Sequence, residues 1–328
     1  MITVDSIRAF ITHPTTNEII FSDSVFVKVT PPNTHIPFAP VLDVNNNPEN
    51  PIISIRSFGE DPTEVAKMGV SFVRGIQDNG SIATGKHFPG HGDTEIDSHI
   101  ALPVFEHDNQ RLEGIELVPF QAAIDAGMRA IMTAHIAVPG LSNNRLPATL
   151  TEEVLTDLLR AELGFEGIVF TDAMDMAAVD RAFPSGEASV RAILAGADVI
   201  LMPRDVGEAI GAIADAVRSN RIEEERIERS VSKLLRLKEE MGLHEQRLVD
   251  VNKVPSLVGI PSHIEEAQEV ADRSMTLIRN GGNLLPLLGT RTARVMSVSY
   301  QNGNNSISGR YFDGRLRETY LRLNRTSV

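Results

Sequence analysis

The stretch from Lys86 to His99, KHFPGHGDTEIDSH, contains the densest group of side chains that could do chemistry. It holds three histidines, one lysine and three acidic residues within 14 positions. Its glycines and proline indicate a loop of tight turns. Asp97 and His99 are separated by one residue, so in a turn the carboxylate can reach the imidazole and hold it as a proton shuttle. The stretch predicts an acid/base centre, and a surface loop of solvated histidines is the alternative.

The same stretch has a second chemical interpretation, which is a metal site. His87, His91, Asp93 and His99 are residue types that bind zinc, although their spacing matches no zinc pattern. The chain has no cysteine. Disulfides, cysteine-ligated zinc and thiol catalysis are therefore excluded.

Asp172 is the second candidate, because it ends the apolar run 167–172 (GIVFTD). A carboxylate at the end of a buried strand could act as a nucleophile. The alternative is that it caps the following helix, a role for which Asp175 is the better placed of the two.

Arg56 is the third candidate and follows the polar loop at residues 45–47. A guanidinium there could hold a hydroxyl or a carboxylate of a ligand. On residue type alone, an ion pair with Glu60 or Asp61 is an equal alternative.

These candidates follow short apolar runs that recur along the chain with helical patterns between them. The runs are nearly continuously apolar and end in polar residues, as expected of parallel strands covered on both faces. Polar residues at the carboxyl ends of such strands form the site of a (β/α) barrel or a doubly wound sheet. The five runs are 36–44, 81–88, 129–135, 167–172 and 197–202.

One helical pattern is especially clear. Thr151 is placed to cap it, and Gly164 is placed to end it. Its apolar stripe consists of Val154, Leu155, Leu158, Leu159 and Leu163.

The length available is short for a closed barrel. Eight units need roughly 250 residues, or about 31 each, whereas residues 36–242 supply five runs. Before them, the one strand candidate is Glu18 to Val29, whose alternation indicates a half-exposed strand. We therefore expect an α/β fold that is either an incomplete barrel or an open sheet, followed by the start of a second α/β domain.

The order of the patterns predicts four parts. Residues 1–35 are an atypical N-terminal segment, and residues 36–245 are a domain of about five β/α units. Residues 246–264 are a linker, and residues 265–328 begin a second α/β domain. In this last part we expect a strand at residues 293–300 and a final helix at residues 310–324.

Composition narrows the function classes. The net charge is 31 minus 44, or −13, which argues against a nucleic-acid partner. There is no apolar run of about 18 residues and thus no predicted membrane span. No signal peptide is visible, so a cytoplasmic location is the default expectation. The sequence leaves the oligomeric state open.

Five segments together resemble a known family. APVLDVNNNPENP, RSFGEDP, KHFPGHGDTEIDSH, MTAHI and GIVFTDAMDM occur in this order, and the series is similar to glycoside hydrolase family 3, most of all to its β-N-acetylglucosaminidase (β-hexosaminidase) branch. The resemblance covers about residues 36–245 and, more weakly, 265–300. Residues 158–175 fit the family's nucleophile signature.

The resemblance implies that residues 36–245 form a TIM-type (β/α)8 barrel domain that is incomplete at the N-terminus, and that residues 265–328 begin a C-terminal α/β sandwich domain. It also implies a retaining glycosidase that removes terminal β-linked N-acetylglucosamine from peptidoglycan or chitin fragments, as in peptidoglycan recycling. By the same resemblance, Asp172 corresponds to the nucleophile, and His99 to the acid/base, with Asp97 as its partner. Arg56, Lys86 and His87 correspond to residues that hold sugar hydroxyls. The partner is then a small amino-sugar glycoside, with no metal and no cofactor.

The sequence also departs from the family. The family's Asp-x-Glu-Gly-Gly motif is not found before APVLDV. By the resemblance, we expect that N-terminal barrel units and most of the second domain are missing. Three alternatives therefore remain open. They are a truncated and catalytically impaired family remnant, a β-glucosidase-type member, and a metal-dependent hydrolase that uses the histidine cluster.

Overall fold

The computed structural model describes residues 36–142, 144–245, 250–283, 294–299, 310–320 and 322–327. Within them the chain forms two compact units, divided between Met275 and Thr276. The strand expected between Glu18 and Val29 lies outside the described residues. The four-part division of the chain stays a prediction.

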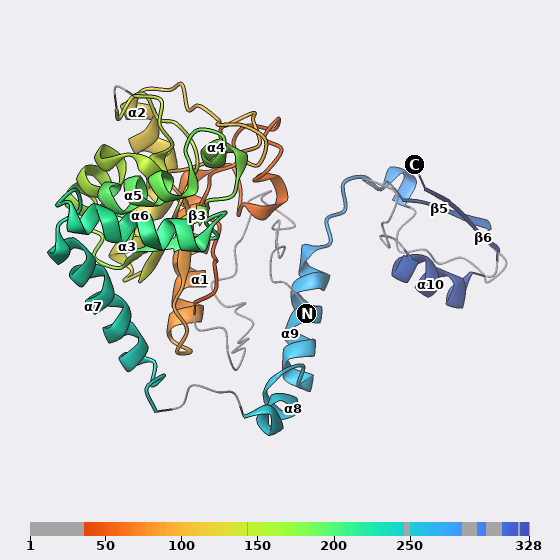
Figure 1. Ribbon diagram of the computed structural model, residues 1–328. Coiled ribbons are helices and arrows are strands. Elements are labelled where there is room, and N and C mark those ends of the chain that lie inside the picture. Colours follow the sequence, from red (N-terminus) through yellow and green to blue (C-terminus); the bar gives the residue numbers. More distant parts are fainter. Residues whose placement is uncertain are drawn as a thin grey trace. The chain divides into compact units, whose positions relative to one another are not determined.

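A parallel sheet with the strand order β1-β2-β3-β4 organises the first unit (Figure 1). The strands are β1 Thr84–Phe88, β2 Ala130–Thr133, β3 Ile168–Ala173 and β4 Val199–Leu201. The run at residues 36–44 lies beside β1, where Val41 forms a parallel bridge to Lys86. All five apolar runs thus take part in one sheet, and their order in space follows their order in the sequence. In the described residues this is fewer than the eight strands of a closed barrel.

Helices connect the strands and gather around the sheet, as α1, α3, α5 and α6 do in Figure 1. A helix between two successive strands returns the chain so that the second strand can run parallel to the first. In chain order the helical segments are α1 Pro62–Gln77, α2 Asn109–Arg111, the π-helical Leu112–Glu116, α3 Leu117–Asp125, the π-helical Glu153–Glu162, α4 Ala177–Asp180, α5 Ser185–Ala195, α6 Val206–Arg218 and α7 Glu224–Glu240. Short 3-10 turns occur at Ser54–Arg56 and Ala148–Leu150.

Both faces of the sheet are buried, which explains why its strands are continuously apolar. On one face, Ile131 belongs to the main core together with Leu155 of the second π-helical segment. On the other face, Met132 packs with Leu237 of α7. Because neighbouring residues of a strand point to opposite faces, a strand covered on both sides needs apolar residues at every position.

The helix expected after Thr151 forms, but its start differs from the prediction. The hydroxyl of Thr151 donates to the carbonyl oxygen of Pro147 at 2.8 Å, so it does not cap the helix. The hydroxyl is engaged there because the carbonyl of Pro147, just before the 3-10 turn at Ala148–Leu150, accepts its hydrogen bond. The predicted stripe is confirmed by four buried side chains, and Gly164 follows the helix with a φ of 70°. The four are Val154, Leu155, Leu158 and Leu159.

The chain beyond α7 contains short helical segments and one longer helix. A 3-10 turn at Val251–Lys253 leads into α8 Val254–Leu257, and α9 spans Pro261–Ser274. A further 3-10 turn at Gly281–Asn283 belongs to the second unit.

In the second unit, β5 Arg294–Ser299 confirms the expected strand. The final helix is shorter than predicted, because α10 spans Arg310–Thr319 and the chain then extends as β6 Arg322–Ser327. Strand β6 pairs in parallel with β5 over its whole length. The reason is that the backbone groups of β5 offer these residues a ladder of hydrogen bonds that a further helical turn would leave unused.

The buried stripe can be tested with a matched pair of leucine substitutions. Leu155 is fully buried, whereas Leu235 of α7 is 59% exposed. We expect Leu155→Ala to lower the free energy of unfolding by about 2–5 kcal/mol, because it leaves a cavity in the core. Leu235→Ala should change it by no more than about 0.5 kcal/mol. Urea unfolding of both variants checks this, and equal losses would contradict the packing described.

Candidate active site

Four polar side chains stand at the carboxyl ends of neighbouring strands. Asp43 follows the bridged residue Val41, and His87 lies in β1. His135 follows β2, and Asp172 lies in β3. Since parallel strands all end at the same edge of their sheet, residues from four separate parts of the sequence meet there.

Asp43 is the most heavily bonded of them. Its carboxylate is fully buried and accepts a hydrogen bond from the backbone N–H of His91 at 2.7 Å. The backbone N–H of His87 is 3.2 Å from both oxygens, and the His87 ring contacts Oδ2 through Nδ1 at 2.7 Å. Burial by itself raises the pKa of Asp43, but the two histidines and these hydrogen bonds outweigh it and hold the pKa below its usual value. Asp43 is therefore ionised.

His87 joins Asp43 to Arg56. The Nε2 atom of His87 lies 3.4 Å from a terminal nitrogen of Arg56. Because a guanidinium can only donate, Nε2 is assigned as the acceptor and Nδ1 as the atom that carries the proton toward Asp43. The alternative ion pair of Arg56 with Asp61 is not formed, since Asp61 caps α1 by accepting from Thr63 and Glu64.

Asp172 stands in β3, half-buried, with its Oδ1 accepting from the N–H of Ala173 at 2.8 Å. It does not cap the next helix, and neither does Asp175, because α4 begins after Met176 without a side-chain cap. Burial raises the pKa of Asp172, but His87, His135, the N–H of Ala173 and Lys86 together lower it below its usual value. An ionised, partly desolvated carboxylate of this kind can act as a nucleophile.

His135 connects the ends of β2 and β3. Its Nε2 donates to the carbonyl oxygen of Ala173 at 2.9 Å, and its Nδ1 lies 2.7 Å from the hydroxyl of Thr149. The ring is fully buried, and this burial lowers its pKa. His135 is therefore a buried ring that fixes the backbone beside Asp172.

Asp97 and His99 form the pair that their spacing predicts. One carboxylate oxygen of Asp97 is 2.8 Å from Nδ1 of His99 and accepts from the backbone N–H of His99 at 2.8 Å. The His99 side chain is 60% exposed, and its Nε2 edge is left for another partner. The pair can hold and transfer a proton at the surface of the site.

Asp93, in the same loop as this pair, belongs to a charged cluster. Asp93 contacts His107 at 2.9 Å and Arg111 at 2.8 Å, and Arg111 contacts Oε1 of Glu116 at 3.4 Å. Glu116 is fully buried, and its other oxygen has no hydrogen-bond partner among the described residues. Burial, only partly offset by Arg111, raises the pKa of Glu116 to about 7.

The residues proposed for a metal site are engaged in separate contacts. His91 is buried with Nδ1 2.7 Å from Thr94 and Nε2 3.1 Å from Ser98. His87, Asp93 and His99 have the partners given above. In the described part of the chain, no group of three or more such side chains is arranged to hold a metal ion.

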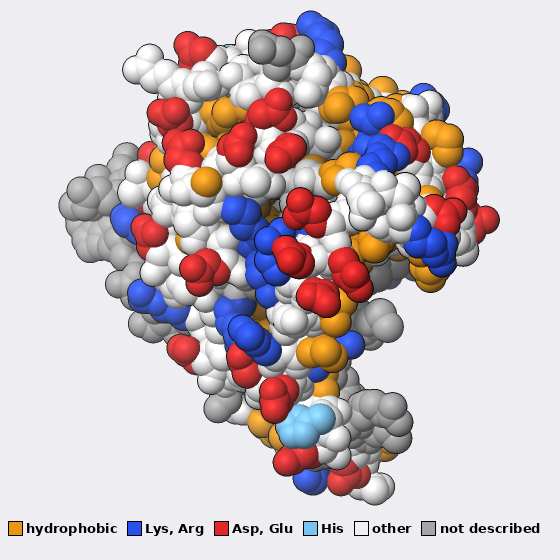
Figure 2. Space-filling view, turned by 60° about the vertical axis from the view of Figure 1, so that its left-hand side comes forward, with side chains coloured by type: hydrophobic (Ala, Val, Ile, Leu, Met, Phe, Trp, Pro, Cys, Tyr) orange, Lys and Arg blue, Asp and Glu red, His pale blue; other side chains and the backbone are white. Residues whose placement is uncertain are grey.

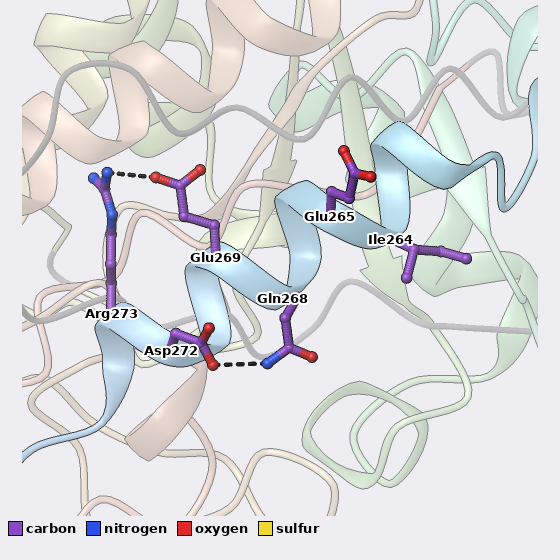
Figure 3. A pocket seen from close by; sticks show the side chains of 6 residues that line it. All are labelled: Ile264, Glu265, Gln268, Glu269, Asp272 and Arg273. Carbon is purple, nitrogen blue, oxygen red and sulfur yellow. Dashed lines mark hydrogen bonds and ion pairs between the residues drawn. The ribbon is translucent and has the colours of Figure 1, made fainter.

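The surface outside these residues has a hollow on α9 and a face of mixed charge. Figure 3 shows a hollow lined by residues 264–273 of α9 alone, where Gln268 bonds to Asp272 and Glu269 pairs with Arg273. On the face shown in Figure 2, acidic and basic side chains are interspersed. Among the described helices, none is both long enough and apolar enough to cross a bilayer.

Comparison with known families decides the assignment. The model described as Glycosyl hydrolase family 3 N terminal domain matches residues 28–237, more than half of the chain. The chain belongs to glycosyl hydrolase family 3. The parallel sheet and its returning helices are accordingly the TIM-type α/β fold of that family's N-terminal domain, as the sequence predicted.

The chain is also similar in sequence to named members of this family. It is 37% identical over 275 residues to a protein named beta-hexosaminidase A from Pseudoalteromonas piscicida, covering 77% of this chain and 45% of that one. It is 35% identical over 279 residues to a beta-N-acetylglucosaminidase/beta-glucosidase from Cellulomonas fimi, covering 82% and 50%. The chain thus spans about half the length of the curated relatives it matches.

A solved structure of a family 3 beta-N-acetylglucosaminidase, from Paenibacillus sp. str. FPU-7, gives a TM-score of 0.79 at 38% identity. The match covers 90% of this chain and 57% of that one. The fold described above is therefore shared with a family 3 member over nearly the whole chain.

The structure adds residues to those that sequence reasoning singled out. Arg56 contacts His87, and Asp97 contacts His99 as their spacing predicted, while Lys86 lies close enough to lower the pKa of Asp172. Asp43 and His135 are not among the sequence candidates, although they lie in the polar ends of the apolar runs 36–44 and 129–135. The signal that could have found Asp43 is a single charge inside the run IPFAPVLDV, where an acid is costly unless it is bonded.

Removal of the buried carboxylate of Glu116 has a predictable pH dependence. Because its folded-state pKa is raised, the stability it contributes is present below about pH 4.5 and is lost as the pH rises through about 7. We expect Glu116→Gln to be close to wild type at pH 5 and increasingly more stable than wild type toward pH 8. Unfolding free energies measured from pH 5 to pH 8 check this.

The matched control is Glu113→Gln, which removes an exposed carboxylate from the same π-helical segment. It should change the free energy of unfolding by less than about 0.5 kcal/mol. A Glu116→Gln variant that loses stability steadily toward pH 8 would contradict the proposed protonation of Glu116.

Proposed function

We propose that this family 3 chain carries the active centre of a retaining β-N-acetylhexosaminidase. The substrate is a small glycoside that ends in β-linked N-acetylglucosamine, such as a peptidoglycan or chitin fragment. The observation that supports this most is that the chain has both an ionised carboxylate, Asp172, and a separate Asp97–His99 pair that can transfer a proton. A retaining glycosidase needs these two functions and no others at the bond that breaks.

In the first step, an oxygen of Asp172 attacks the anomeric carbon, and the bond from that carbon to the glycosidic oxygen breaks. The Nε2–H of protonated His99 gives its proton to the leaving oxygen, while Asp97 stabilises the charged ring through Nδ1. The products of this step are the free aglycone and a glycosyl ester on Asp172.

In the second step, water attacks the anomeric carbon of that ester. His99, now neutral at Nε2, takes a proton from the water, and the carboxylate of Asp172 leaves. The sugar is released with its original configuration, because two displacements have taken place at the same carbon. The enzyme returns to its starting protonation state.

Arg56, Lys86 and His87 are proposed to hold sugar hydroxyls. Arg56 and His87 are in contact with each other, and Lys86 precedes His87 in β1 and lowers the pKa of Asp172. Arg56 and Lys86 can donate hydrogen bonds to sugar hydroxyls, and Nε2 of His87 can accept one. Asp43 would hold the His87 ring in place for this contact.

Two alternatives remain within the same family. The name of the Cellulomonas fimi relative includes beta-glucosidase, so a glucose-terminated substrate is the second candidate. A chain that folds but turns over no glycoside would instead be a catalytically impaired remnant. The relative rates on 4-nitrophenyl β-N-acetylglucosaminide and 4-nitrophenyl β-glucoside distinguish the proposed substrate from a glucose-terminated one. A folded protein that is inactive on both would indicate the remnant.

The nucleophile can be tested directly with 4-nitrophenyl β-N-acetylglucosaminide. We expect Asp172→Asn to lower kcat/KM by about 10³-fold or more, because an amide does not form the glycosyl ester. Asp175→Asn is the matched control, since it removes an exposed carboxylate three residues away and should retain activity. Equal activity of wild type and Asp172→Asn would contradict the assignment.

A further inference from the structure

The Asp97–His99 pair is well ordered within its own turn. The carbonyl oxygen of Asp97 accepts from the N–H groups of Ile100 at 2.9 Å and Ala101 at 3.0 Å, and its side chain holds His99 as described. These contacts are all local. They orient the imidazole relative to Asp97, but they leave undetermined where the whole turn lies relative to Asp172.

Ser98, the residue between the two members of the pair, supplies that missing connection. His99 is exposed and Asp97 is half-buried, whereas Ser98 is buried with only 2% of its surface exposed. Its backbone carbonyl accepts from the N–H of Ala178 at 3.3 Å. Ala178 belongs to α4, the short helix that directly follows the strand of Asp172.

The hydroxyl of Ser98 makes a second contact, to the buried ring of His91. Thr94 donates its hydroxyl proton to the carbonyl oxygen of His91, so its oxygen accepts from Nδ1–H of that ring. Burial lowers the pKa of His91 to about 4, which leaves the ring neutral with its one proton on Nδ1. The Nε2 atom is then a lone-pair acceptor, and Ser98 donates to it over 3.1 Å.

His91 is itself anchored from two directions. Its backbone N–H donates to Asp43 at 2.7 Å, and its carbonyl oxygen accepts from the side-chain amide of Asn50 at 2.8 Å. A continuous series of buried hydrogen bonds therefore runs from Asp43 through His91 to Ser98. The same Asp43 also holds the ring of His87.

We propose that Ser98 is a positioning residue, whose hydrogen bonds to His91 and Ala178 set the place of the His99 imidazole relative to Asp172. The inference rests on the proposed function and deepens it. Deleting the hydroxyl leaves a buried acceptor on His91 without its donor, so the turn loses the contact that holds it inward. His99 then remains paired with Asp97 but meets the glycosidic oxygen less often in a geometry suited to proton transfer.

The leaving group distinguishes such a role from a general loss of structure. Departure of 4-nitrophenol needs little help from an acid, whereas departure of a sugar from di-N-acetylchitobiose depends on it. We expect Ser98→Ala to lower kcat/KM for the disaccharide by about 10- to 100-fold. For the 4-nitrophenyl glycoside, kcat/KM should fall less than about threefold, which a small shift of the loop would account for. A merely destabilised protein would lose both in equal proportion.

Azide supplies an independent readout, since it attacks the glycosyl ester without needing a base. Added azide should raise kcat of Ser98→Ala on the 4-nitrophenyl glycoside and leave wild type nearly unchanged. Ser189→Ala is the matched control, because it also deletes a buried serine hydroxyl, one that bonds to the carbonyl of Ser185 within α5. It should show neither the leaving-group difference nor the azide effect.

Nuclear magnetic resonance of ¹⁵N-labelled histidine tests the contact without any turnover. In wild type, Nε2 of His91 should show the shift of a hydrogen-bonded acceptor, and Ser98→Ala should move that signal and change the His99 ring signals. Wild type without activity on any glycoside would overturn the proposed function alone, and the His99 signals would still decide this inference. Unchanged His99 signals, or equal losses on both substrates, would overturn it.

Discussion

The buried carboxylate of Asp43 is the interaction on which the rest of the site depends. It lies in an apolar segment, fully shielded from water, and it is stable there because two backbone N–H groups and one imidazole donate to it. Removing such a charge from water is costly unless its oxygens are bonded. Its bonds therefore define the path of the chain from His87 to His91 beside the bridged segment at Val41.

That constraint has two consequences at the sheet edge. The ring of His87 is held with one nitrogen toward Asp43 and the other toward Arg56, so a strand residue and a residue of the 3-10 turn at Ser54–Arg56 are kept in contact. The backbone of His91 is held inward, which buries its ring and makes it an acceptor for Ser98. One acid thus organises both the group proposed to bind sugar and the group proposed to place the acid/base pair.

The two proposed catalytic functions are held in different ways. Asp172 is part of a strand whose neighbours bond to it on both sides, and His135 fixes the adjacent Ala173. His99 is exposed on a loop, and its neighbour Ser98 anchors this loop through a hydrogen bond to His91. A nucleophile must meet one carbon in a fixed geometry, whereas a proton donor must serve the leaving group first and water afterwards. A rigid strand and an anchored loop suit these separate demands.

Sequence patterns alone determined the features that depend on neighbours in the chain. The five apolar runs indicated a parallel sheet because covered strands need apolar residues on both faces, and the one-residue spacing of Asp97 and His99 allowed their pairing. Motif resemblance indicated family 3. By contrast, the partnership of Asp43 with His87, the inward turn of His91 and the pairing of β6 with β5 were decided only by tertiary structure. These contacts join residues far apart in the sequence, and strand register and burial, which local spacing does not encode, choose their partners.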